Sequence, residues 1–390
     1  MKRKKLLLVT YLIMLGILAS QCGPTPTQPS TELENLLVDV FEPQPGEKVL
    51  VMYDLPHDGL SDNAGWEERR AMAEEWHDAF EWLGNEVNFE VHPVLTYLAT
   101  GAHNGPLPDM GEMDGKEVSF EEIVADTNII VALTEYSASA PLIVFTEEYP
   151  DLRAASMPMV SRSMEDTALV ADYGEVARKA QILAEKFEGA VGAEVEFTTG
   201  DVMYFDLRYR EAEKDDGQLH ADREGARVIN LPSGEVYIAT YEGEVDGEPS
   251  KTAGTIPVMC NDVLMLVIVD ANRITELIGE GACPIGERAF IAQDEALRNI
   301  AELGLGVNDK AVVTGNVLED EKVYGMHWAV GRSDHIGGTV GPEDFSDHRF
   351  VIHRDIVHPF GSQVEVVRLA LEYADGTSET IIQDGQYTVF

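Results

Sequence analysis

The run KVLVMY at residues 48–53 constrains the fold more than any other stretch of the chain. It is almost wholly apolar, as expected for a strand in a parallel sheet that is covered on both faces. Residues 65–84 then carry apolar side chains at helical spacing and end at Gly84, a natural helix stop. After a short helix, a further apolar strand is predicted at 127–133. Strands that alternate with helices indicate an α/β layer with right-handed crossovers.

The second half of the chain has a different pattern. Short strands are separated by Gly and Asp-Gly turns, as in SGEV and YADGTSET, and such turns predict β-hairpins. We therefore predict an α/β N-terminal domain with a parallel sheet at about 48–185, followed by an α+β domain at about 186–390. The first strand is followed by DLPHDG and not by a GxGxxG loop, so dinucleotide binding by that route is not expected.

The net charge of the 390-residue chain is −42, from 70 acidic and 28 basic residues. A nucleic-acid-binding surface needs a basic face, and anionic lipid repels an acidic surface. We therefore expect no nucleic-acid partner and no docking on anionic lipid through the protein surface. The acidic excess is spread along the chain, which is typical of a solvated acidic surface.

The first 22 residues have the composition of an export signal. Four basic residues precede an apolar run from Leu6 to Ala19, which is too short for a comfortable membrane span. The run ends in ASQC, so residues 1–22 resemble a bacterial or archaeal lipoprotein signal in which Cys22 is lipidated after cleavage. Gln21 departs from that pattern, which has Gly or Ala there, and an ordinary signal peptide or an uncleaved anchor is the alternative.

Residues 23–46 are rich in Pro, Thr and Glu and predict a flexible tether between this signal and the folded body. The expected location is the outer face of the cell membrane, with contact to the membrane only through the N-terminal lipid or anchor. Cys260 and Cys283 are the other cysteines, and no CxxC motif is present, which excludes a zinc site of cysteine type. We expect them to be small buried hydrophobic residues, and whether they pair stays open.

The stretch DHRFVIHRDIVH at residues 347–358 reads as a strand, yet it contains three histidines and two aspartates. Because strand side chains alternate between faces, His353 and Asp355 point the same way, between Val351 and Val357. An imidazole and a carboxylate among valines are costly to bury without a partner, so this pair predicts a functional site.

Three other stretches place acidic groups or imidazoles in apolar, glycine-containing surroundings. Glu235 follows a glycine turn at the start of a strand, Glu302 lies beside a glycine-rich turn, and LEDEKVYGMHWAVG contains Glu321 and His327. With His353 and Asp355, these residues could hold two divalent ions of zinc, cobalt or manganese through imidazole nitrogens and a bridging carboxylate. A glutamate not committed to metal could act as the general base.

The order of NLPSGEVYIA, AELGLGVN, DEKVYGMHWAVG and IHRD resembles the thermophilic aminopeptidase family, that of aminopeptidase T and aminopeptidase S. The run YSASAPLIVFTEEYPDLRAASMPMVSRSMEDTALVADYGEV resembles the first domain of that family, so the resemblance covers roughly residues 48–388. It implies a two-metal aminopeptidase that acts on short peptides, and a homodimer. The metal ligands that it implies are Glu235, Glu302, His327, His353 and Asp355, with Glu321 as the general base or a further site carboxylate.

The chain departs from the family pattern at the residue that would stabilise the oxyanion formed during peptide hydrolysis. The family has a tyrosine seven residues after the ligand histidine, whereas this chain has Asp334 there and His335 next. An ionised Asp334 would repel a developing oxyanion, and only a protonated His335 could take over the role of the phenol. The stretch YSASA also differs from the Ser-x-Thr-His pattern of many relatives.

Two alternatives to the hydrolase remain open from the sequence. Dihydroxypyridine ring-cleaving dioxygenases resemble the same family and bind one Fe(II), for which His327, His353 and Asp355 would supply a facial triad. A non-catalytic metal-binding or ligand-binding surface lipoprotein is the other alternative, favoured by the tether and the missing tyrosine.

Overall fold

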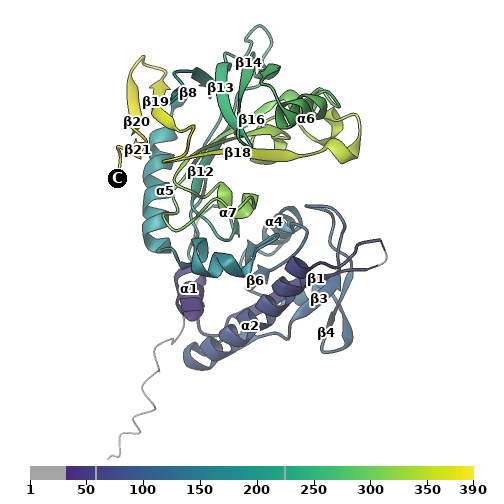
Figure 1. Ribbon diagram of the computed structural model, residues 1–390. Coiled ribbons are helices and arrows are strands. Elements are labelled where there is room, and N and C mark those ends of the chain that lie inside the picture. The colour runs from purple at the N-terminus through teal and green to yellow at the C-terminus, as the bar shows by residue number, and fades with distance from the viewer. Residues whose placement is uncertain (1–31, 58, 224) are drawn as a thin grey trace, which may run out of the picture.

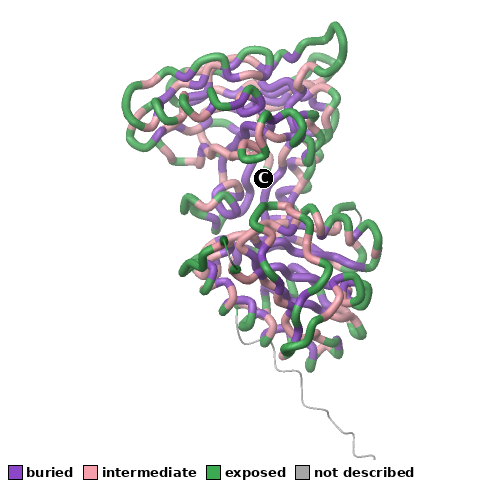
Figure 2. The backbone as a smooth tube through the Cα atoms, turned by 90° about the vertical axis from the view of Figure 1, so that its right-hand side faces the viewer, coloured by how far each residue is buried: buried purple, intermediate pink, exposed green. Residues whose placement is uncertain are grey.

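The computed structural model describes residues 32–57, 59–223 and 225–390, which form two lobes (Figure 1). Buried backbone runs through both lobes and through the narrower region between them (Figure 2). The predicted signal at 1–22, with Cys22, and the first part of the predicted tether lie outside the described residues.

Helices are fewer than strands in the described chain. The α-helices are α1 (Glu32–Phe41), α2 (Ala64–Val87), α3 (Phe120–Ala125), α4 (Ser139–Glu148), α5 (Tyr173–Phe187), α6 (Ala282–Ile291) and α7 (Val317–Asp320). Among the short 3-10 helices, η4 (Asp334–Ile336) lies in the second half of the chain.

The first sheet is mixed. In spatial order its strands are β11 (Val228–Asn230), β7 (Arg153–Ser156), β6 (Ile129–Ala132), β1 (Lys48–Leu55), β3 (Leu95–Leu98), β4 (Met110–Met113) and β5 (Lys116–Ser119), and β2 (Glu90–Val91) also pairs with β1. The strands from β11 to β3 run parallel, whereas β4 and β5 form an antiparallel edge.

Strand β1 shows why the apolar run predicts a doubly covered strand. Val49 and Val51 belong to the large core that includes α2, whereas Leu50 and Met52 belong to a second core on the opposite face. Both faces of β1 are therefore covered, and the prediction of a strand in a parallel sheet that is covered on both faces is confirmed.

Two antiparallel sheets form the other lobe (Figure 1). The five-stranded sheet contains β10 (Glu213–Asp215), β12 (Glu235–Ala239), β16 (Ile300–Gly306), β17 (Gly325–Gly331) and β18 (His353–Pro359), in that order. The eight-stranded sheet contains β15 (Arg273–Ile278), β14 (Val263–Asp270), β13 (Ala253–Cys260), β9 (Val202–Asp206), β8 (Ala190–Phe197), β19 (Val366–Tyr373), β20 (Ser378–Gln383) and β21 (Gln386–Tyr387).

Strand β11 crosses the predicted domain boundary. The sequence assigns residues 186–390 to the second domain, but Val228–Asn230 pairs in parallel with β7 of the first sheet. A boundary near residue 185 therefore does not separate the two lobes. Three residues with no strong strand pattern gave no signal that the chain returns to the sheet that it had left.

The prediction of a tether at 23–46 is wrong for the residues of α1. Leu37, Val40 and Phe41 are fully buried in the large core, and the main chain of Val40 and Phe41 accepts hydrogen bonds from elsewhere in the fold. The apolar residues at helical spacing within 32–41 outweigh the polar composition of the wider segment.

Two further expectations need correction. Cys260 and Cys283 form a disulfide that joins the end of β13 to α6, so they are not free buried hydrophobic residues. The strand predicted from residue 347 begins only at His353, because residues His348–Phe350 form a short 3-10 helix.

No helix in the part of the chain that the structure describes is both long and apolar enough to cross a membrane.

Replacing Leu37 with Ala tests whether α1 is part of the folded body. Leu37 is fully buried, so Leu37→Ala should lower the free energy of unfolding by about 2–5 kcal/mol. Val38→Ala is the matched control, because Val38 is 37% exposed on the same helix and its loss should change stability by less than about 0.5 kcal/mol. Denaturant unfolding of both variants is the measurement, and equal small effects would show that α1 does not belong to the core.

Candidate metal centre

The candidate metal centre lies on one face of the five-stranded sheet. Directly opposed residues of antiparallel strands share a face, and His327 lies opposite Gly304 and Val357. Glu302 lies opposite Ala329, which in turn lies opposite Asp355. Strand by strand, the charged residues of this face are Glu213 and Asp215 on β10, Glu235 on β12, Glu302 on β16, His327 on β17, and His353 and Asp355 on β18.

Two glycines of β16 make room for this face. The prediction of a glycine-rich turn at ELGLG is wrong. The stretch is the end of a fully buried strand. A Cβ on Gly304 would collide with the imidazole of His327, and a Cβ on Gly306 would collide with the main chain of residues 321–323. The two glycines therefore allow the His327 ring and the main chain of residues 321–323 to lie directly against β16, the buried strand that carries Glu302.

Glu302 joins two groups of candidate ligands. His327 Nε2 lies 3.1 Å from Glu302 Oε1 and 3.1 Å from Glu235 Oε2. His353 Nε2 lies 3.0 Å from Glu302 Oε2 and 3.5 Å from Asp355 Oδ1. The ligand atoms within each group of three lie within 4.8 Å of one another. One carboxylate thus directs one oxygen to each group, which is the arrangement of a bridging ligand.

Each group contains a buried oxygen without a hydrogen bond. Glu235 Oε2 and Asp355 Oδ1 are both buried and have no hydrogen-bond partner among the described residues. The imidazoles of His327 and His353 lie 3.1 Å and 3.5 Å from these oxygens, at ion-pair distance. Such atoms are rare in folded proteins and need a partner, and a cation in each group would supply one. The chemistry of the residues present therefore fits metal binding.

Lys322 adds a cation that the sequence analysis missed. Its side chain is fully buried, and Nζ lies 2.6 Å from Glu321 Oε1 and 3.4 Å from Asp215 Oδ2. It also forms an ion pair with Glu235 Oε1. The stretches EKD and DEK gave no signal for this cluster, because short charged runs in an acidic chain are typical of solvent-exposed loops.

The two candidate ligand histidines, His327 and His353, have pKa values raised well above the ordinary value. Burial lowers the pKa of both imidazoles, but the adjacent carboxylates of each group outweigh it. Burial alone would raise the pKa of Glu302, yet hydrogen bonds from His327 and His353 hold that pKa low. The group is therefore a charged network.

Two carboxyls near Lys322 have raised pKa values. Burial is the main cause for Glu321, whose pKa rises to about 8 although the Lys322 charge opposes it. Burial also raises the pKa of Asp215 to about 7 against the same charge. Glu321 lines the same pocket as Glu235 and Glu302, and a carboxyl with a pKa near neutrality suits a general base, so that role of Glu321 stays a prediction.

The side chains of Asp334 and His335 lie in different surroundings, and only that of His335 lines the pocket. Asp334 is paired with Arg332 and is about one-third exposed, and among the described residues it does not line the pocket over the metal groups. His335 does line it, with its ring centroid 5.0 Å from that of His353. Burial, reinforced by His353 and Arg332, lowers the pKa of His335 to about 4. At neutral pH His335 is therefore an uncharged imidazole, and the protonated form considered from the sequence is disfavoured.

A pocket of about 560 Å³ opens over the centre, between the two lobes. The lobe that contains the five-stranded sheet contributes Glu235, Glu302, Glu321 and His353 to its wall. The first lobe contributes residues of α4 such as Ser139, and Asn230 at the end of β11. The pocket therefore has one wall from each lobe.

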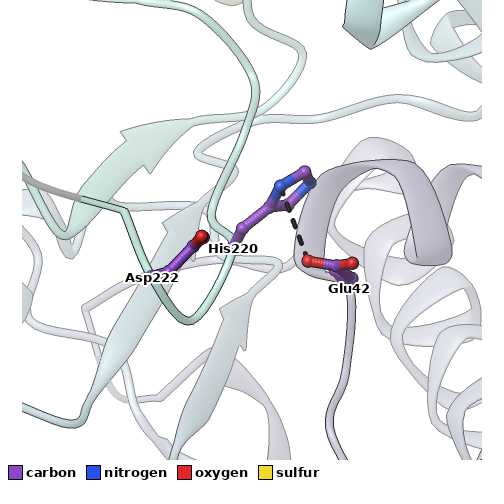
Figure 3. Close-up of side chains that lie close together, drawn as sticks. All are labelled: Glu42, His220 and Asp222. Atoms are coloured by element: carbon purple, nitrogen blue, oxygen red, sulfur yellow. Dashed lines mark ion pairs between the residues drawn. The ribbon is translucent and has the colours of Figure 1, made fainter.

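Two other clusters of possible ligands lie on the surface of the described chain. Glu42 at the end of α1 faces His220 and Asp222 of a neighbouring loop (Figure 3), with His220 Nδ1 3.7 Å from Glu42 Oε2. His77, Asp78 and Glu81 form the other cluster on α2. The carboxylates of both clusters are exposed, so water already solvates them and they do not require an ion.

Comparisons with known proteins show a shared fold. The chain has a TM-score of 0.59 with 2,5-dihydroxypyridine dioxygenase from Pseudomonas putida, at 13% identity over 92% of this chain and 96% of that one. It has a TM-score of 0.53 with AmpT (aminopeptidase T) from Thermus thermophilus, at 13% identity over 92% of this chain and 99% of that one. No model of a known protein family matches, and no curated protein matches in sequence. At this identity the likeness establishes the architecture alone.

The raised pKa values predict how pH acts on the metal-free protein. For the two histidines the stabilisation is complete below the unfolded pKa of 6.5 and is lost as pH rises. The two carboxyls with pKa values of about 7 and about 8 also hold protons that the unfolded chain releases near pH 4. These four groups have the same sign and outweigh His335 and His358, whose lowered pKa values of about 4 favour the opposite trend, so the chelated protein should melt at a lower temperature at about pH 8 than at about pH 5.5.

Saturation with a divalent ion should remove that pH dependence, because the ions replace the protons as counter-charges. Thermal unfolding with and without chelator is the measurement. A chelated protein that is most stable at about pH 8 would contradict the charged network described above.

Gly304→Ala should disturb the centre from within β16. The added methyl group displaces the His327 ring, so stability should fall by about 1–3 kcal/mol and divalent-ion binding should weaken. Gly286→Ala in α6 is the matched control, because a Cβ there meets no atom within 4 Å. Calorimetric metal titration and thermal unfolding of both variants provide the check, and unchanged metal binding in Gly304→Ala would place His327 outside the centre.

Proposed function

We propose that the protein is a metal-dependent hydrolase that holds two divalent ions of zinc, cobalt or manganese and releases residues from the amino end of short peptides. The observation that carries the proposal is the position of Glu302, whose two oxygens serve two separate groups of ligands. Glu235 and His327 would complete one site, and His353 and Asp355 the other.

The charge of the centre supports two ions rather than one. Five carboxylates gather there, from Asp215, Glu235, Glu302, Glu321 and Asp355. Lys322 is the one lysine or arginine paired with them in the described residues. If bound ions displace the protons of the two imidazoles and of the carboxyls with raised pKa values, the five carboxylates and Lys322 leave four negative charges, which two divalent ions would balance. Buried carboxylates without counter-ions are strongly unfavourable.

The remaining groups of the pocket suit an amide substrate with a free amine. Bound divalent ions would polarise the scissile carbonyl and lower the pKa of a shared water molecule. Glu321 lines the same pocket as the candidate ligands and would accept the proton of the attacking water and pass it to the leaving amine. Glu147 and Glu213 line the outer wall and would attract the positively charged amino end of a peptide.

The ring-cleaving alternative requires one iron held by His327, His353 and Asp355. Over residues 32–390 apart from 58 and 224, these three do not form one compact ligand group, because His327 groups with Glu235 and the other two group together. Glu302 lies between the two histidines. This geometry favours the hydrolase, and a site that binds metal without turnover is the remaining alternative.

We further propose that the protein works outside the cytoplasm, on the outer face of the cell membrane. The basic and apolar N-terminus with Cys22 supports this location. The disulfide between Cys260 and Cys283 supports it independently, because disulfides persist in oxidising compartments.

Glu321→Gln tests the proposed function. The chelated protein should not cleave aminoacyl anilides or short peptides, and added zinc, cobalt or manganese should restore cleavage. Because the amide cannot accept a proton, Glu321→Gln should lower kcat by about 100- to 10,000-fold and leave the number of bound ions unchanged. Steady-state kinetics and metal analysis of the same preparations provide the measurement.

Glu295→Gln is the control. The Glu295 side chain is 81% exposed and pairs with Arg298, which is not a candidate ligand, so loss of its charge should leave kcat unchanged. Oxygen consumption with a dihydroxypyridine and Fe(II), without peptide cleavage, would establish the ring-cleaving alternative. Ion binding with neither reaction would establish a binding protein.

A further inference from the structure

The two ligand groups differ in their contact with Lys322. Glu235 belongs to the group with His327, and its Oε1 is already bonded to the Lys322 ammonium. The same ammonium bonds Glu321 and lies near Asp215, so it is fixed by three carboxylates in a fully buried position. This cation cannot leave without exposing three buried negative charges to one another.

The other group has no such contact. In the part of the chain that the structure describes, no lysine or arginine forms an ion pair with Glu302 or Asp355. Asp355 Oδ1 has no hydrogen-bond partner there, although it is buried. The full charge of this carboxylate is therefore available to an incoming ion.

We propose that Lys322 makes the two halves of the metal centre unequal, so that the group of Glu302, His353 and Asp355 binds a divalent ion first and tightly, and the group of Glu235, Glu302 and His327 binds a second ion more weakly. The inference rests on the proposed two-ion centre and adds an order of filling to it. The ammonium already neutralises part of Glu235 and repels a dication that approaches the same carboxylate. Lys322 is thus a positioning residue that acts on the second ion through Glu235.

Titration of the chelated protein with Co²⁺ alone tests this inference. Calorimetry counts the binding steps, and the visible absorption of cobalt reports the ligands of each step. We expect a tight step followed by a weaker one in the natural protein. Asp355→Asn should abolish the tight step, whereas Glu235→Gln should abolish the weak step and leave the tight one unchanged.

Lys322→Met keeps most of the length of the side chain and removes its charge. It should tighten the second step by about 10- to 100-fold, the usual size of an effect on metal affinity from a group that contacts a ligand, with little change in the first. Lys186→Met is the matched control, because Lys186 pairs only with Glu379 on the surface of the fold among its described contacts. Neither step should change in that variant.

The outcomes separate this inference from the proposed function. Two steps of equal affinity, loss of the tight step in Glu235→Gln, or an unchanged second step in a folded Lys322→Met would overturn the order of filling and leave a two-ion hydrolase intact. Failure of the natural protein to bind Co²⁺ would overturn both proposals. If Lys322→Met does not fold, the two ligand variants still decide, because they assign each step to one group.

Discussion

Charge compensation on one face of a sheet is the constraint on which the rest of this structure depends. A β-sheet in a protein core usually covers each buried face with apolar side chains, but here one face carries clustered carboxylates and imidazoles. Such a face is stable only if cations, protons or metal ions balance it. Lys322 supplies one fixed charge, and the raised pKa values of the histidines show protons in place of further cations.

The opposite face of the same strands explains why the ligands are held rigidly. Val236, Leu303 and Trp328 alternate with the site residues and are buried in the large core. The period of two that directs ligands to one face directs apolar anchors to the other. A shift of register by one residue would therefore expose the anchors and bury the ligands among them, so core packing fixes the alignment of the site.

The sequence predicts best what periodicity controls. Strand β1 is confirmed because its apolar run leaves no polar face, and His353 and Asp355 share a face because alternation requires it. Lys322 and Asp215 could not be recognised, since their partners lie on other strands and their own neighbours along the chain are charged. The helix α1 was hidden within a segment whose composition is polar on average.

Long-range pairing is the other feature that composition cannot indicate. The disulfide between Cys260 and Cys283 and the return of β11 to the first sheet depend on which segments meet in space. Asp334 is a further case in which position along the chain does not predict position in space. It occupies the sequence position of a tyrosine in the thermophilic aminopeptidase family, but its side chain pairs with Arg332.

The pairing of β11 with β7 of the first sheet has a consequence for the order in which the parts of the molecule can fold. During synthesis, β7 emerges with an open edge that only Val228–Asn230 can occupy in the finished fold. More than 70 residues of chain, from Ser156 to Val228, separate the two strands. Until they meet, the first sheet presents an unprotected parallel edge, which is the kind of surface on which strands of other chains can pair. The last residue of β11 also lines the pocket, so the step that closes this edge is the step that finishes the wall opposite the metal centre.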